Sequence, residues 1–183
     1  MDTWLAIAGI VIGLWALAMA APPLFQMIWG KPNVSIELKK SDLSGRGVQI
    51  RCYISNKPVT NRFLRTIGVV RQATEIFGDY SVSEYGTGKS IIHFERALIG
   101  TDRDNASLQA TLFPATMPAR FVLIAHLNEL PAISISHNHP DQGTIIPAGK
   151  YVARVKVFTG DHSVISAERE FIVGPTPTET YLL

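Results

Sequence analysis

The fold of this chain is decided by its stretch 147–173, which reads PAGKYVARVKVFTGDHSVISAEREFIV. Its first half places Tyr151, Ala153, Val155 and Val157 at every second position. An alternation with a period of two predicts a strand that turns one face toward a core. The Thr-Gly-Asp-His sequence at 159–162 predicts a turn, and residues 163–173 then return as a second strand. The stretch therefore predicts a β-hairpin.

The return strand has a core face that one charged residue interrupts. Ile165, Ala167, Phe171 and Val173 share this face, and Arg169 stands between Ala167 and Phe171. A β-bulge at Arg169 would keep the apolar side chains on one side of the strand.

The same two-residue rhythm recurs through most of the chain before the hairpin. We expect strands at 34–39, 48–55, 79–84, 90–98, 107–112, 120–127 and 132–136. Segment 61–77 fits a strand or a helix, and its β-branched residues around Gly68 favour a strand over 64–71. Many short strands between Gly, Pro, Asp and Asn loops favour a sandwich over an α/β fold.

Residues 147–157, the Gly160-Asp161 turn and the closing segment 170–173 resemble the last two strands of immunoglobulin-like and fibronectin type III-like domains. Tyr151 matches the place where such domains often carry a corner tyrosine. The resemblance implies an all-β, immunoglobulin-like antiparallel β-sandwich over residues 31–174. It departs from antibody-type domains, because Cys52 is the single cysteine and every tryptophan lies elsewhere. It implies an architecture, and such folds host many functions.

The first thirty residues differ from the rest of the chain. Residues 3–30 carry no charged side chain and hold all three tryptophans, Trp4, Trp15 and Trp29. As a helix, the apolar segment 4–21 would rise about 27 Å, close to the thickness of roughly 30 Å of a bilayer's hydrocarbon core. We therefore expect a single transmembrane α-helix in residues 1–30, which Pro22 and Pro23 end or kink. The alternatives are a signal peptide cleaved after 18–20 and a buried soluble helix.

Basic residues follow this segment. Lys31, Lys39, Lys40 and Arg46 lie within the range over which positive charge sets topology, so we expect the domain in the cytoplasm. Residues 31–71 hold nine Lys or Arg against two acidic residues. Such an excess of positive charge indicates membrane lipid as a partner if the residues face the bilayer, or else charges spread over solvent-exposed strand faces. The overall charge of +2 is too small to indicate a nucleic-acid partner.

Three features could carry chemistry. His137, His139 and Asp141, with His126 upstream, are a candidate zinc-ligand set, although a polar loop explains the same residues. Residues 86–90 imitate the end of a phosphate-binding loop, but Ser83 stands where that loop needs glycine and a strand follows. Cys52 falls on the apolar face of its strand, which predicts a buried and inert thiol.

These observations predict a non-catalytic, membrane-anchored interaction module that needs no cofactor and binds an unidentified protein. Two alternatives stay open. One is an adhesion or envelope-assembly module outside the cytoplasm, and the other is a metal-dependent enzyme that uses the His-rich loop. The tail 175–183 is rich in Thr and Pro, which predicts a flexible segment without regular structure.

Overall fold

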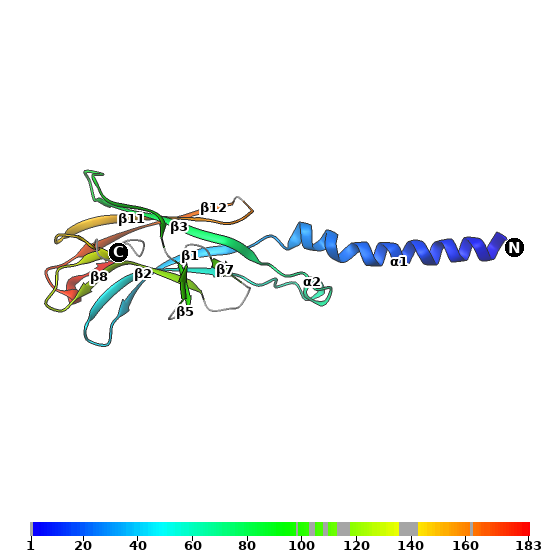
Figure 1. The fold of residues 1–183 in the computed structure, drawn as a ribbon, viewed down its shortest axis with the longest axis horizontal. Helices are drawn as coiled ribbons and strands as arrows, with labels where there is room; N and C mark the ends of the chain where they lie inside the picture. The colour runs from blue at the N-terminus through cyan, green and yellow to red at the C-terminus, as the bar shows by residue number, and fades with distance from the viewer. Residues whose placement is uncertain are drawn as a thin grey trace.

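A long helix and a two-layered β domain make up the chain. The computed structural model describes residues 2–97, 99–102, 105–107, 110–112, 118–135, 143–161 and 163–183. Helix α1 spans Asp2–Trp29 and projects from one end of the β domain (Figure 1). The linker 30–33 joins it to the first strand, so we call this end of the domain the anchor end.

The first sheet is antiparallel and places strands β1, β2, β8 and β5 side by side in that order. These strands span Val34–Asp42, Gly47–Asn56, Ala119–Leu127 and Ile99–Asp102. Strand β6, Asn105–Ser107, pairs with β5. Strand β9, Ile133–Ile135, pairs with β8 and with β10, Gly143–Ile145.

The second sheet is also antiparallel and has the order β13, β12, β11, β3, β4. Strands β3, β4 and β11 span Ala73–Glu84, Ser90–Ala97 and Gly149–Phe158. Strands β12 and β13 span Val164–Val173 and Tyr181–Leu182, and β7, Ala110–Leu112, pairs with β3.

The core lies between the two sheets and is built from alternate residues of each strand. The inner face of β2 buries Val48, Ile50, Cys52 and Ile54. The inner face of β11 buries Tyr151, Ala153, Val155 and Val157, as their alternation predicted. The rings of Tyr80 and Phe121 pack with centroids 5.8 Å apart. Full burial of one such aliphatic or aromatic side chain contributes about 1.5–3 kcal/mol, so the two inner faces supply most of the stability.

A buried hydrogen-bond relay also joins the sheets. The Tyr80 hydroxyl lies 2.7 Å from Ser134 Oγ, which donates to the carbonyl oxygen of Leu123 at 2.7 Å. Tyr80 belongs to β3 in one sheet, whereas Ser134 and Leu123 belong to β9 and β8 in the other. Burial raises the pKa of the Tyr80 hydroxyl, which therefore stays protonated and able to donate.

Helix α1 runs through both prolines to Trp29, so of the two outcomes expected at Pro22 and Pro23, an end or a kink, the end is wrong. Proline fixes φ near its helical value, and although each ring removes one ladder hydrogen bond and crowds the preceding turn, long apolar helices can tolerate interior prolines by local adjustment. The helix ends instead at Gly30, whose N–H donates to the carbonyl of Gln26 at 2.8 Å.

The strand expected over 64–71 is also wrong. Helix α2 spans Arg62–Thr66, and β3 begins only at Ala73. The Asn61 side chain caps this helix by accepting the N–H groups of Phe63 at 2.9 Å and Leu64 at 3.4 Å. Gly68, at a φ of +80°, then turns the chain, and these local signals outweigh the β-branched residues.

The remaining strand expectations divide. The strands at 34–39, 48–55, 79–84 and 120–127 are confirmed, as is the described part, 90–97, of the strand at 90–98, and part of 132–136 forms β9. The expected strand 107–112 is represented by β6 and β7, between which Leu108 and Gln109 lie outside the described residues. No bulge occurs at Arg169, because the β11–β12 register runs without a shift from Gly149 opposite Val173 to Phe158 opposite Val164. Arg169 is instead exposed within a regular strand.

The tail does form regular structure, contrary to expectation. A short 3-10 helix, η1, spans Pro177–Glu179, and β13 pairs with β12 through Phe171 opposite Leu182. Thr180 between them is fully buried, and the Leu183 N–H donates to the carbonyl of Glu170 at 2.9 Å. The tail thus closes one edge of the second sheet.

Candidate functional site

Most of the apolar helix is exposed, and among the side chains that the structure describes in α1 only Ala21 and Phe25 are half-buried. Trp4 and Trp15 are 78% and 67% exposed, and Trp29 is 42% exposed. The segment Ile7–Trp29 has a mean hydropathy of 2.0 and is long enough to cross a membrane. Pro22 and Pro23 lie inside it. Such a surface is costly in water, and by length and composition it suits the apolar interior of a bilayer.

The last turn of α1 is fastened to the loop between β2 and β3. The Gln26 side-chain amide donates to the carbonyl of Val70 at 2.6 Å and accepts the Val70 N–H at 2.9 Å. The ring of Phe25 meets the edge of Phe63 in α2 at 6.0 Å between centroids. Sequence reasoning missed this contact, although Gln26 is the one amide side chain in the apolar segment 3–30.

Asn56 holds the same region together from inside. Its Oδ1 accepts the N–H of Asn33 at 3.1 Å, and its Nδ2 donates to the carbonyls of Arg71 at 2.8 Å and Leu112 at 3.1 Å. The side chain is buried, so these bonds replace those lost to water. Asn56 therefore fixes the linker, the end of the β2–β3 loop and β7 against one another.

The basic residues that follow α1 in sequence separate in space. Lys31 stays beside the helix in the linker, whereas Lys39 and Lys40 lie toward the far end of β1. Arg46 is in the β1–β2 turn, at the end of the domain opposite α1 (Figure 1). Four other basic residues, Lys57, Arg62, Arg65 and Arg71, belong instead to the β2–β3 loop at the anchor end.

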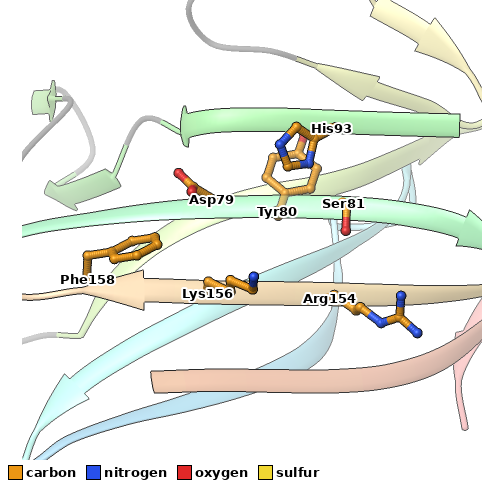
Figure 2. A pocket seen from close by; sticks show the side chains of 7 residues that line it. All are labelled: Asp79, Tyr80, Ser81, His93, Arg154, Lys156 and Phe158. Atoms are coloured by element: carbon orange, nitrogen blue, oxygen red, sulfur yellow. The ribbon is translucent and has the colours of Figure 1, made fainter. Parts of the chain in front are cut away.

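The outer face of the second sheet carries a shallow hollow of about 270 Å³. Figure 2 shows the side chains of Asp79 and Ser81 from β3, His93 from β4, and Arg154, Lys156 and Phe158 from β11 around it. The rings of Phe158 and Phe77 stack with centroids 4.9 Å apart, so an apolar surface lies beside the charged residues. Mixed polar and aromatic surfaces of this kind suit recognition of another protein.

Ion pairs order the same face. Arg154 bonds Glu168 at 2.7 Å, and Lys150 bonds Glu170 at 2.7 Å while lying 3.6 Å from the ring centroid of Tyr85. The hydrogen bond from Lys150 to Glu170 raises the pKa of the lysine. These pairs are solvated and add little stability.

Two of the candidates for chemistry have structural roles. Cys52 is fully buried, and burial raises the pKa of its thiol far from that of a nucleophile. The loop at 86–90 joins β3 to β4 through Gly86 and Gly88, both at positive φ, and leads into a strand rather than a helix. It has no helix N-terminus to receive a phosphate.

The candidate metal set is represented in the described residues by His126 alone. His126 is buried, its Nδ1 lies 2.8 Å from Thr180 Oγ1, and burial lowers the pKa of the imidazole. His137, His139 and Asp141 lie outside the described residues. Within the described part of the chain, no three His, Cys, Asp or Glu side chains form a group able to hold a metal ion.

Comparison of the chain with protein-family models, with curated proteins and with solved structures finds no match.

Proposed function

We propose that this protein is a single-pass membrane protein in which α1 spans the bilayer and an immunoglobulin-like sandwich acts as a non-catalytic interaction module. One observation carries the proposal. The helix is exposed over most of its described length and supplies no residue to the hydrophobic core of the β domain, so all but its last turn is free to enter lipid.

The strand order supports the immunoglobulin-like part of the proposal. Immunoglobulin-like domains place strands A, B, E and D in one sheet and C, F and G in the other. Assigning β1, β2, β3, β5, β8, β11 and β12 to A, B, C, D, E, F and G reproduces both sheets, with β4 as an added strand beside C.

The start of β11 supports the same assignment. The Tyr151 hydroxyl donates to the carbonyl of Pro147, four residues upstream, at 2.8 Å, as the corner tyrosine of strand F does. Antibody-type domains carry their second cysteine two residues after this tyrosine and the first on strand B. Here the position two residues after Tyr151 holds Ala153, and Cys52 lies on β2, the counterpart of strand B; both side chains are fully buried.

A role in binding rather than catalysis is favoured by how the reactive side chains are used. Cys52 packs in the core and His126 bonds Thr180, so neither is presented to a substrate. The outer face of the second sheet, with its ordered ion pairs and the Phe77–Phe158 stack, is the surface that we assign to a protein partner.

The flanking charges favour a cytoplasmic location of the sandwich. Lys31 and the three basic residues of β1 and the β1–β2 turn follow the helix, whereas Asp2 precedes it. Maleimide labelling of an introduced exposed cysteine, Thr87→Cys, in intact and opened cells reports the side directly.

The binding surface is tested by placing a photo-crosslinking residue at Ser81 in the full-length protein in its native membrane. The control is the same residue at Tyr53, which lies on the outer face of the first sheet. A discrete protein adduct from position 81 and none from position 53 supports the assignment. Equal labelling from the two faces contradicts it.

A further inference from the structure

The loop between β2 and β3, residues 57–72, carries charge of one sign only, and we call it the basic loop. Its charged residues are Lys57, Arg62, Arg65 and Arg71, and no Asp or Glu occurs between them. Lys57, Arg62 and Arg65 are exposed, whereas Arg71 is half-buried. A concentration of cations without partners of opposite sign in the same segment attracts an anionic surface.

The position of the basic loop relative to α1 is fixed by one contact within α2 and one after it. The Gln26–Val70 amide pair and the Phe25–Phe63 ring contact fasten it to the last turn of the helix. Phe25 lies four residues before Trp29, which is about 6 Å along the helix axis. The basic loop therefore lies beside the last turns of α1 (Figure 1). If the membrane span ends at Trp29, the loop lies at the level where the helix leaves the hydrocarbon core.

Apolar side chains accompany the cations. Phe63 is 60% exposed and Val70 is 47% exposed, although Val59 and Val69 of the same loop are buried and hold it to the domain. Arg62, Arg65 and Thr66 line an open hollow of about 410 Å³ beside Phe63. Exposed aromatic residues next to arginines are characteristic of segments that lie in the headgroup layer.

We propose that the basic loop is a second membrane contact, which rests on an anionic phospholipid surface with Phe63 at the boundary of the acyl chains. Arg62 and Arg65 pair with lipid phosphates, whose oxygens match the guanidinium fork. The inference rests on the proposed span of α1. It makes the orientation of the sandwich on the bilayer depend on the lipid charge.

Two carboxylates at the anchor end limit the attraction without cancelling it. Asp161 lies in the β11–β12 turn and accepts hydrogen bonds from Ser163 and Thr159, which lower its pKa. Glu75 belongs to the start of β3. Neither lies on the basic loop, so its three exposed cations, Lys57, Arg62 and Arg65, have no carboxylate within the loop itself.

The test uses the full chain in nanodiscs of phosphatidylcholine, with and without phosphatidylserine. A spin label at Thr66→Cys reports on the basic loop, and one at Thr87→Cys, in the turn at the opposite end, is the matched control. Cys52 is buried and stays unlabelled. The measured quantity is the accessibility of each label to oxygen relative to a water-soluble nickel chelate.

We expect phosphatidylserine to shield the label at 66 from nickel and to leave the label at 87 aqueous. Arg62→Gln with Arg65→Gln should abolish the response to phosphatidylserine, since two basic residues shift the equilibrium between orientations of the domain with the loop on and off the lipid surface roughly 30-fold. Lys39→Gln with Lys40→Gln removes the same charge from β1 and should leave the response unchanged.

Two results overturn the inference while the anchor stands. In the first, the chain enters the nanodisc but the label at 66 is aqueous in both lipids. In the second, the label is shielded equally in both lipids and in the arginine variant, which indicates a contact with protein, such as a second copy of the chain. If the chain does not enter the nanodisc at all, the proposed span of α1 fails instead.

Discussion

The side-chain amide of Gln26 and the backbone of Val70 form two hydrogen bonds, of 2.6 and 2.9 Å, across 44 residues of sequence. This pair connects the end of the apolar helix to the β domain at a fixed place. The domain is therefore held by more than the four-residue linker 30–33.

Replacing Gln26 by Leu should release this connection. The Val70 N–H then loses its partner, and its hydrogen exchange in the full-length protein in nanodiscs should accelerate about 5–10-fold, because one hydrogen bond of this kind contributes about 1 kcal/mol. Met27→Leu, on the neighbouring exposed position, is the control. The Gly45 N–H, bonded to Asp42 at the opposite end of the domain, should exchange equally in all variants. Unchanged exchange at Val70 in Gln26→Leu contradicts the role assigned to the pair.

Removing the buried amide of Asn56 should cost more than any surface change nearby. Asn56→Ala leaves the N–H of Asn33 and the carbonyls of Arg71 and Leu112 without this partner, and we expect a loss of about 3 kcal/mol in the free energy of unfolding. Denaturant unfolding in detergent measures it. Ser55→Ala, which removes a half-buried bond to Ser35, should cost less than about 1 kcal/mol. Equal losses in the two variants would mean that Asn56 is not the main tie at the anchor end.

Acidification should weaken the fold through His126. Burial lowers the imidazole pKa in the folded state, so below the ordinary value of about 6.5 the unfolded chain binds a proton that the folded chain does not. Stability therefore falls as the pH drops below about 6.5 toward the folded-state pKa, and this loss should be absent from His126→Gln. Melting temperatures at a series of pH values measure the difference. Parallel curves for the wild type and His126→Gln would show that His126 does not titrate on unfolding.

The proposed immunoglobulin-like register makes a covalent prediction. Ala153→Cys should form a disulfide with Cys52 on mild oxidation, since these are the positions of the inter-sheet bridge in antibody-type domains. Ala167→Cys, on β12 and partly buried, is the control and should stay reduced. Mobility of the denatured protein on non-reducing gels distinguishes the two. Absence of the bridge in Ala153→Cys under conditions that leave the protein folded contradicts the register.

The strands were predictable where neighbouring residues alone determine the structure. The alternation of residues 151–157 predicted the inner face of β11, and the apolar neighbours of Cys52 predicted a buried thiol. The helix α2 was missed because the cap from Asn61 competes with β-branched residues only a few positions away.

Other features depend on contacts that a linear pattern does not contain. The tail folds because Thr180 hydrogen-bonds to His126, 54 residues earlier, and because Tyr181 and Leu182 pair with the edge of β12. The basic loop reaches the helix because Asn56 and Val69 position it from inside the domain. Sequence position alone instead indicated Lys39, Lys40 and Arg46 as the residues nearest the membrane, and the fold carries these away from the anchor end.

The central claim, that α1 spans a membrane and tethers the sandwich, is tested most directly by alkaline carbonate washing of membranes that contain the full-length protein. A protease site inserted between Lys31 and Pro32 allows the two parts to be followed separately. The account predicts that the intact chain stays in the membrane pellet and that, after cleavage, the sandwich enters the supernatant while residues 1–31 remain with the lipid. Recovery of the uncut chain in the carbonate supernatant would contradict it.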